Sequence, residues 1–241
     1  MPTNSVIQTN GHTTSYLEEG PKDGPLIVFV HGWPELSHSW RHQLPAMARL
    51  GFHAVAPDLR GYGGSSKYRE HAAYSQENVV ADMLCFADAL NAETAVWVGH
   101  DWGSPTVWNI ASHHPDRCRA VASLCVPYAT LEYGVDRVIE LVDRSVYPLE
   151  EYPVGQWDYQ LYYQECFEKA QSAMEAKVEN TVKALFRCGN PDAVGKPALT
   201  ASLRSSSGWV GGAGEAPDLP LDEQVISADD LVVYSQALQD S

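Results

Sequence analysis

The chain has few basic residues, and this shortage excludes several kinds of partner. It carries 16 lysine and arginine residues against 31 aspartate and glutamate residues in 241 positions, so its formal net charge is −15. Nucleic acids and anionic membrane surfaces attract basic patches, and we expect neither of them as a partner. The sequence also has no apolar run long enough to span a bilayer, and its polar N-terminus lacks the pattern of a signal peptide.

Cysteine is scarce as well, and its spacing excludes a disulfide framework. The five cysteines are scattered, odd in number and nowhere arranged as C-x-x-C. They are typical of free thiols in a cytoplasmic protein. No cysteine–histidine pair has ligand spacing, so we expect no metal site, and nothing in the sequence calls for an organic cofactor.

The first half of the chain alternates short apolar runs with segments of helical spacing. Apolar runs at 25–30, 52–56, 94–98 and 120–124 predict buried strands. Segments at 37–50, 75–90 and 102–113 predict helices, the second of them capped by Ser75. This alternation predicts an α/β fold with a mostly parallel sheet and helices on both faces.

From about residue 126 the strand pattern stops. Residues 161–187 predict one or two helices with Gly189 as a C-cap, and 205–216 reads as a flexible loop. Residues 227–238 predict a final helix with Ser227 and Asp230 as an N-cap pair. We therefore divide the chain into a core over 1–127 and a helical lid or cap over 128–241.

The segment Gly99-His100-Asp101-Trp102-Gly103 lies between a predicted strand and a predicted helix. The form G-x-nucleophile-x-G is a sharp turn that exposes its central side chain beside the N-terminal amides of the new helix. With aspartate at the centre, the turn presents a carboxylate nucleophile that attacks carbon and forms an ester. The alternative is that Asp101 is only a helix N-cap; the flanking glycines and a second motif favour the nucleophile.

That second motif is His31-Gly32-Trp33-Pro34, directly after the first apolar run. Hydrolases place a loop here that supplies part of an oxyanion hole. The backbone N–H groups of Trp33 and Trp102 are the two candidate donors, and rigid amides suit developing negative charge. The alternative is an ordinary turn with a buried histidine.

Four stretches together resemble the soluble epoxide hydrolases of the α/β-hydrolase superfamily. They are HGWPELSHSWRHQLPAMARLGFHAVAPDLRGYGGSS, VGHDWGS, HPDRCRAVASLCVPY and WDYQLYYQE. The first three are shared with haloalkane dehalogenases, and the fourth, Trp157 to Glu165, is the discriminating one. Ser104 departs from the glycine that is usual at its position in the family.

The resemblance implies an α/β-hydrolase fold and the opening of a small-molecule epoxide by water to a vicinal diol. Asp101 would be the nucleophile and Tyr159, on the lid, would hydrogen bond the epoxide oxygen. His100 is expected to be a structural hydrogen-bonding residue rather than the base. The residues expected to line a substrate pocket are His31, Pro34, His100 and Tyr162.

The family also implies a late histidine, with an orienting acid, that activates water. None of the nine histidines follows His114. We therefore expect a C-terminally truncated chain that lacks the last strands of the core, is incomplete for turnover, and self-associates through an exposed sheet edge. Two alternatives stay open: a haloalkane or haloacid dehalogenase of the same fold, and a non-catalytic ligand-binding fragment.

Overall fold

A computed structural model describes residues 2–128 and 134–239, which fall into two compact units. The first unit comprises the described residues up to Tyr128, and the second runs from Gly134 to Gln239. Each unit is described by itself. No described helix is both long and apolar enough to cross a membrane.

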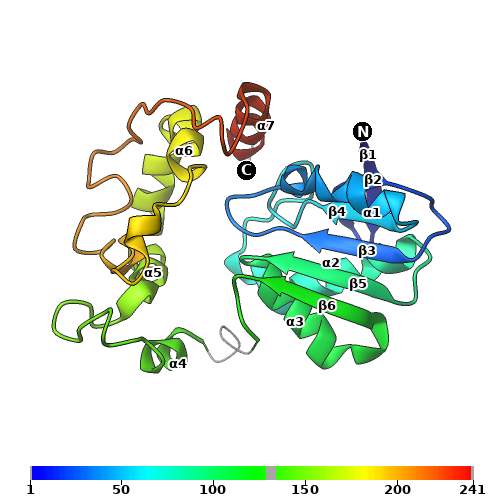
Figure 1. Cartoon of the computed structure of the whole chain (residues 1–241), viewed down its shortest axis with the longest axis horizontal. Helices are drawn as coiled ribbons and strands as arrows, with labels where there is room; N and C mark the ends of the chain where they lie inside the picture. Colours follow the sequence, from blue (N-terminus) through cyan, green and yellow to red (C-terminus); the bar gives the residue numbers. More distant parts are fainter. Residues whose placement is uncertain (1, 129–133, 240–241) are drawn as a thin grey trace. The chain divides into compact units, whose positions relative to one another are not determined.

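The first unit is built on a six-stranded sheet with the order β1-β2-β4-β3-β5-β6 (Figure 1). Strand β3 pairs in parallel with β4 and β5, and β5 pairs in parallel with β6, whereas β1 and β2 are antiparallel to their neighbours. The mostly parallel α/β fold predicted from the sequence is confirmed. The bounds of the strands are Thr3–Thr9 (β1), His12–Glu19 (β2), Leu26–Val30 (β3), His53–Pro57 (β4), Ala95–His100 (β5) and Cys118–Leu124 (β6).

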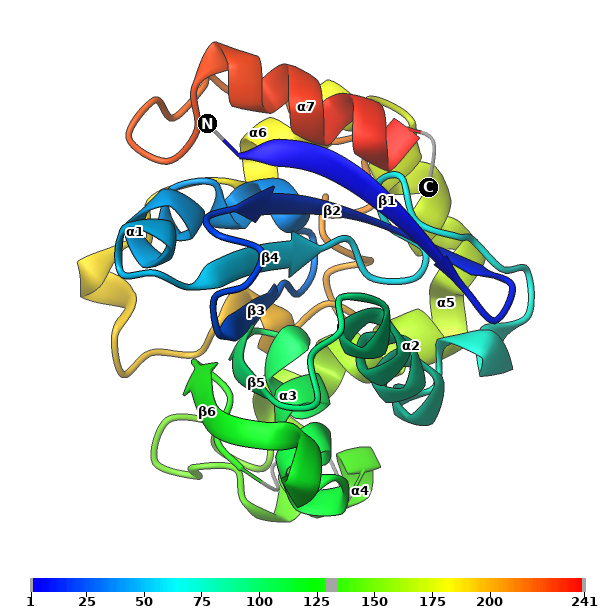
Figure 2. The same cartoon turned by 90° about the vertical axis from the view of Figure 1, so that its right-hand side faces the viewer.

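Helices cover both faces of this sheet because its central strands are apolar on both sides. Every residue of β3 and β4 is buried. Val28 and Val30 pack into one apolar cluster with residues of α2 (Gln76–Ala89) and α3 (Gly103–His113). Ile27 and Phe29 pack into the other with Leu44 of α1 (Gln43–Arg49). Figure 2 shows α2 and α3 together on one side of the strands and α1 on the other.

The helix predicted over residues 37–50 forms as two pieces. Ser37–Trp40 is a short 3-10 helix (η1), and α1 begins at Gln43. Pro45 lies in the first turn of α1, where a missing backbone N–H costs no helical hydrogen bond, so the proline favours a new start. The predicted cap of α2 is confirmed, since Ser75 Oγ accepts a hydrogen bond from the Asn78 N–H at 3.4 Å.

The hairpin of β1 and β2 was not predicted. Its strands are joined by Asn10 and Gly11, which have φ angles of 49° and 79°. Two positive φ angles in a two-residue loop suit the right-handed twist of a hairpin, and an Asn-Gly pair is the local signal for one.

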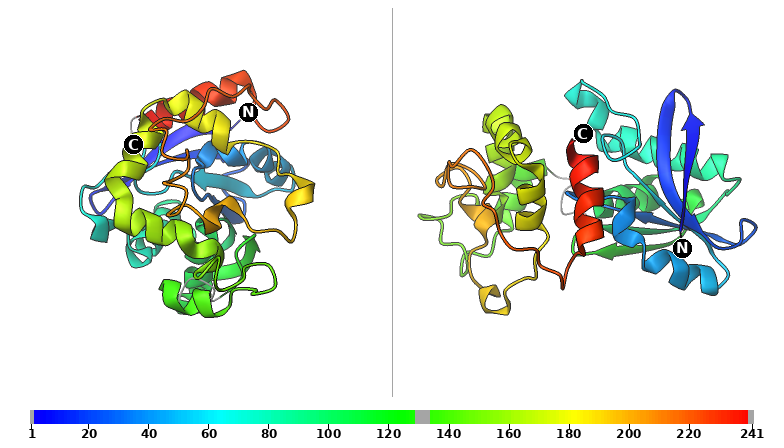
Figure 3. Two further views of the ribbon diagram at one scale, coloured as in Figure 1. Left: turned by 90° about the vertical axis from the view of Figure 1, so that its left-hand side faces the viewer. Right: turned by 90° about the horizontal axis from the view of Figure 1, so that it is seen from above.

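The second unit contains four α-helices and no strand among its described residues. They are α4 (Gly134–Glu140), α5 (Asp158–Glu175), α6 (Val178–Leu185) and α7 (Ala228–Gln239), and Figure 3 shows α5 and α6 in two further views. Short 3-10 turns lie at Gly155–Trp157, Pro191–Ala193 and Leu199–Ala201. In the first unit, the 3-10 turns besides η1 are His71–Tyr74 and Pro115–Arg117.

Two expectations about helix ends have opposite outcomes. Ser227 and Asp230 form the predicted reciprocal cap of α7: Asp230 Oδ2 accepts from the Ser227 N–H at 2.9 Å, and Ser227 Oγ accepts from the Asp230 N–H at 3.1 Å. The prediction of Gly189 as a C-cap was wrong, because α6 ends at Leu185 and Phe186 caps it. The chain leaves helical geometry at Phe186, where ψ is 79°, before it reaches the glycine.

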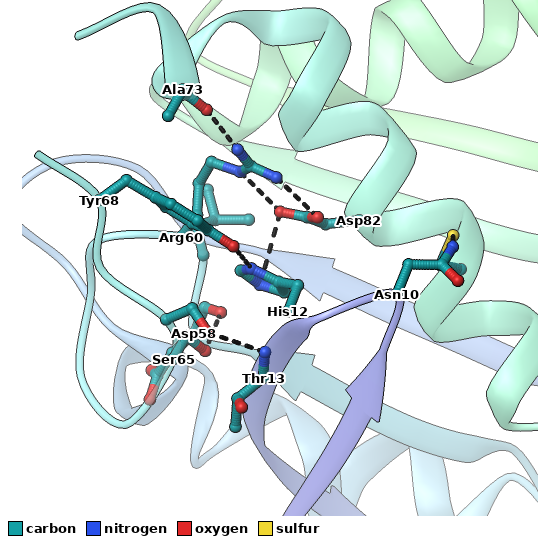
Figure 4. A network of polar contacts seen from close by, with 12 residues as sticks. Asn10, His12, Thr13, Asp58, Arg60, Ser65, Tyr68, Ala73 and Asp82 are labelled. Carbon is teal, nitrogen blue, oxygen red and sulfur yellow. Dashed lines mark hydrogen bonds and ion pairs between the residues drawn. The ribbon is translucent and has the colours of Figure 1, made fainter. Parts of the chain in front are cut away.

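A buried polar network joins the loop after β4 to α2 and to the hairpin (Figure 4). Arg60 donates two hydrogen bonds to the Asp82 carboxylate, both at 2.7 Å, and a third to the Ala73 carbonyl. The guanidinium also lies over the Tyr68 ring, whose hydroxyl contacts His12 Nδ1 at 2.9 Å. Burial lowers the pKa of His12, although Asp82 acts in the opposite direction, so the ring is neutral at pH 7. This network holds the loop that supports the site described next.

Candidate active site

The predicted nucleophile lies in a strained turn between β5 and α3. Asp101 follows the last residue of β5 and has φ of 49°, in the left-handed region. Non-glycine residues are uncommon there, and such strain persists only where the surrounding structure enforces it. The elbow form expected from the sequence is therefore present around Asp101.

The two flanking glycines of the elbow allow strand, turn and helix to approach closely. A Cβ on Gly99 would lie 2.4 Å from the Gly103 carbonyl oxygen, and one on Gly103 would lie 2.2 Å from the Val30 carbonyl oxygen. Any side chain at either position would displace backbone. The spacing G-x-D-x-G is thus a steric requirement of this turn.

The turn after β3 meets the elbow directly, since β3 and β5 are parallel neighbours with Val30 opposite Gly99. The Trp33 backbone N–H donates a hydrogen bond to Asp101 Oδ1 at 3.0 Å. In the described part of the chain, the other carboxylate oxygen, Oδ2, has no hydrogen-bond donor. The carboxylate is thus oriented through one of its two oxygens.

Gly32 makes this approach possible. A Cβ at this position would lie 2.5 Å from Asp101 Oδ1 and 2.7 Å from the Trp102 backbone nitrogen. The two amides predicted to form an oxyanion hole, those of Trp33 and Trp102, therefore both lie near the Asp101 carboxylate. The Trp102 side chain is 36% exposed.

His31 is fully buried, and both of its ring nitrogens are engaged by backbone. Nδ1 lies 2.8 Å from the Gly32 carbonyl oxygen, and Nε2 accepts a hydrogen bond from the Leu59 N–H at 3.0 Å. Burial lowers the pKa of this imidazole, so it is neutral and donates from Nδ1. The ring fixes the turn and presents no surface, so the expectation that His31 lines a pocket receives no support. Pro34, half-buried after a cis Trp33–Pro34 bond, remains a predicted lining residue.

His100 pairs with Glu35, a residue that the sequence reasoning missed. His100 Nδ1 lies 2.8 Å from Glu35 Oε2. The hydrogen bond to Glu35 raises the pKa of His100. Burial alone would raise the pKa of Glu35, but the hydrogen bond and charge of His100 outweigh it and hold that pKa below its usual range. The expected hydrogen-bonding role of His100 is observed, while its role in a pocket remains a prediction.

Ser104, the departure from the family's glycine, makes a specific contact. Its side chain is fully buried, and its hydroxyl lies 3.1 Å from the Gly99 carbonyl oxygen and 3.0 Å from that of Leu124. The hydroxyl therefore links the ends of β5 and β6 beside the elbow.

In the second unit, Tyr159 lies in the first turn of α5. Its hydroxyl accepts a hydrogen bond from Gln160 Nε2 at 3.2 Å, and its ring contacts that of Tyr163 edge to face. The Tyr163 hydroxyl already has a hydrogen-bond partner, because it accepts from the Trp209 indole N–H at 2.8 Å. Burial raises the pKa of Tyr163. The start of α5 is fixed by the buried Asp158, which accepts from the Arg204 backbone and side chain at 2.8 and 2.6 Å.

Tyr162 lines a cavity of about 670 Å³ within the second unit. The walls come from α5, α6 and the loop around Trp209, and apolar side chains dominate them. A cavity of this size and character suits a small apolar ligand. In both described segments, no group of three or more histidine, cysteine, aspartate or glutamate residues is arranged to hold a metal ion.

A strained elbow after a parallel strand, an amide-bearing turn beside it and helices on both faces of the sheet define an α/β hydrolase. The family model described as "alpha/beta hydrolase fold" matches residues 25–219, and the chain belongs to this family.

Several proteins that are similar to this chain are named epoxide hydrolases. Epoxide hydrolase A of Mycobacterium tuberculosis is 48% identical over 126 residues, which are 52% of this chain and 39% of that protein. Bifunctional epoxide hydrolase 2 of Sus scrofa is 36% identical over 236 residues, 98% of this chain and 39% of that protein. The crystal structure of epoxide hydrolase A from Mycobacterium thermoresistibile matches with a TM-score of 0.76 and 32% identity, covering 100% of this chain and 71% of that one. The chain thus spans about two fifths of the length of these curated relatives.

Proposed function

We propose that this chain opens an epoxide through an ester at Asp101, as in an epoxide hydrolase. The observation that carries the proposal is the orientation of the Asp101 carboxylate. Its Oδ1 accepts a hydrogen bond from the Trp33 N–H at 3.0 Å, and the Asp101 backbone has a left-handed φ of 49°. Such a carboxylate is oriented before the substrate arrives, which is the geometric requirement for nucleophilic attack. The epoxide hydrolase names of the similar proteins support the same reaction.

In the first step, Asp101 Oδ2 attacks an epoxide carbon and forms a carbon–oxygen bond. The ring carbon–oxygen bond breaks, and the released oxygen needs a proton. We assign that proton to the Tyr159 phenol, and thus a lid role to the second unit. The product of this step is a hydroxyalkyl ester that contains every atom of the epoxide.

In the second step, a water oxygen adds to the ester carbonyl, and the oxyanion accepts hydrogen bonds from the Trp33 and Trp102 amides. The tetrahedral intermediate then collapses, and the bond between the ester carbon and the substrate oxygen breaks. The departing alkoxide takes one of the two water protons and becomes the diol. The other water proton is left on the Asp101 carboxyl and passes to the Tyr159 phenolate. Activation of the water requires a base. Residues 115–241 contain no histidine, so we expect this step to be slow in the isolated chain and the ester to accumulate.

The test is intact-protein mass spectrometry after incubation of the folded chain with styrene oxide as a probe. We expect a mass increase equal to the whole epoxide, located at Asp101 by peptide mapping. Asp101→Asn should abolish the adduct, and Tyr159→Phe should slow its formation while leaving the fold intact. An unmodified wild-type chain that is folded would overturn the proposal.

Two further readouts, halide release from a haloalkane and reversible binding of the probe, separate the two alternatives. A dehalogenase would release halide from a haloalkane and would be insensitive to Tyr159→Phe. A binding fragment would bind the probe reversibly, without a covalent mass change, and Asp101→Asn would leave that binding unaltered.

We also propose a cytoplasmic location and association of copies along the edge strand β6. Five free cysteines among the described residues support the first. The second is supported by the position of β6 at an edge of the sheet, with Leu124 44% exposed. Light scattering across a concentration series would test association.

A further inference from the structure

One carboxylate joins the two segments that form the candidate active site. Glu35 Oε2 lies 2.8 Å from His100 Nδ1, and it also accepts a hydrogen bond from the Gly32 N–H at 3.3 Å. Gly32 directly precedes Trp33, whose amide holds Asp101, and His100 directly precedes Asp101 itself. Glu35 therefore contacts the neighbours of both partners in the Trp33–Asp101 hydrogen bond.

Glu35 also closes the turn that aims the Trp33 amide. Its backbone N–H donates to the Gly32 carbonyl oxygen at 3.1 Å, while its carboxylate accepts from the Gly32 N–H. Backbone and side chain of one residue thus fix the peptide groups on both sides of Gly32. This closure, together with the His31 Nδ1 hydrogen bond to the same Gly32 carbonyl oxygen, sets the direction of the Trp33 N–H.

Glu35 lies close to a second carboxylate, that of Asp101, and its pairing with His100 offsets the repulsion between the two. The Glu35 side chain is 20% exposed and that of His100 is 37% exposed. The same interaction raises the pKa of His100 and outweighs the burial that opposes ionisation of Glu35. Among the described residues, the groups that face the pair include the Asp101 carboxylate, the neutral His31 ring and the Cys125 thiol. The raised pKa of His100 favours its charged form, and that form opposes the negative charge of Glu35 beside Asp101.

We propose that Glu35 is a positioning residue that holds the Trp33 amide and the His100 ring in register with Asp101. The expected effect on the ester-forming rate rests on the proposed function. The expected effect on the Trp33 amide rests on the geometry alone. Glu35 itself does not contact the substrate. Its loss would let the 32–35 turn move, and a displacement of about 1 Å in such a site reduces rates by about 100-fold.

The experiment compares Glu35→Ala, Glu35→Gln and the control Glu77→Ala, an exposed carboxylate of α2 in the same unit. Glutamine keeps an oxygen that can accept both hydrogen bonds but has no charge, whereas alanine keeps neither. Three quantities are measured: the rate of ester formation with styrene oxide, the hydrogen-exchange protection of the Trp33 amide, and the pKa of His100 by NMR titration.

We expect Glu35→Ala to lower the ester-forming rate by about 10- to 100-fold and to reduce protection of the Trp33 amide. Glu35→Gln should restore that protection and bring the rate to within about threefold of wild type, because neutral hydrogen bonds keep the geometry at roughly half the strength. Both variants should lower the pKa of His100 towards its ordinary value of 6.5. Glu77→Ala should change none of the three quantities.

Two results would overturn the inference. One is wild-type protection of the Trp33 amide in Glu35→Ala, which would show that the turn holds without the carboxylate. The other is an equal rate loss in Glu35→Ala and Glu35→Gln with the amide still protected, which would assign the effect to charge. Both NMR measurements need no epoxide, so failure of the wild-type chain to form an ester would overturn the proposed function while the positioning of Trp33 is still decided.

Discussion

Replacement of Asp82 by asparagine tests how strongly the buried network supports the elbow unit. The Arg60 and Asp82 side chains are each only 9% exposed and are joined by two hydrogen bonds of 2.7 Å. Removal of one partner of a buried ion pair costs about 3–5 kcal/mol, because the other charge is left buried. Asparagine still offers one oxygen, and Arg60 keeps the Ala73 carbonyl and the Tyr68 ring, so we expect the lower end, about 3 kcal/mol.

The assay is hydrogen exchange of the central-strand amides of β3, β4 and β5 in increasing urea, because this reports on the first unit alone. With an m-value of about 1–3 kcal/mol per molar urea, a loss of about 3 kcal/mol lowers the midpoint by about 1–3 M. The matched control is Asp88→Asn on the same helix. Asp88 pairs with Arg117 but is 62% exposed, so its replacement should cost less than about 1 kcal/mol.

A double variant separates burial of charge from loss of contact. Arg60→Met with Asp82→Leu removes both charges and fills the space with apolar side chains, so it should cost less than Asp82→Asn alone. The reasoning is refuted if Asp82→Asn lowers stability no more than Asp88→Asn does. It is equally refuted if the loss of stability in the double variant equals the sum of the losses measured for Arg60→Met and Asp82→Leu separately.

Two further replacements act at the site itself. Gly32→Ala places a methyl group 2.5 Å from Asp101 Oδ1 and must displace the carboxylate, so we expect the ester-forming rate to fall by about 100-fold, the effect of a displacement of about 1 Å in such a site. Gly189→Ala, which meets no atom within 4 Å, is the control, and equal rates for the two variants would contradict the steric argument. Ser104→Ala removes one buried hydroxyl and should cost about 1 kcal/mol in urea unfolding, with the ester-forming rate unchanged. A tenfold slower rate would instead give the hydroxyl a part in setting the elbow.

Local features of the sequence were sufficient to predict the frame of the site. The glycine spacing around Asp101, the cap of α2 and the Ser227–Asp230 cap of α7 are all visible as local patterns. The groups that require Gly103 and Gly32, which are the Val30 carbonyl and the Asp101 carboxylate, are nevertheless distant in sequence. Continuous apolar runs likewise predicted β3, β4 and β5, because strands buried on both faces need no polar alternation. The hairpin was missed because β1 is largely exposed and polar, although its Asn-Gly turn carried a usable signal.

The sequence by itself determined the elbow, its carboxylate and the α/β class, because each is marked by a pattern that can be read along the chain. Only the tertiary structure decided which distant groups serve that elbow. Glu35 and His100 are 65 positions apart, and Trp33 and Asp101 are 68 apart, and they meet because β3 and β5 are parallel neighbours. His31 shows the same limit: a histidine beside a motif suggests chemistry, but its complete burial between two backbone groups makes it a structural hydrogen-bonding residue. Spacing along a chain specifies a turn, whereas burial and partners depend on which strands the fold places side by side.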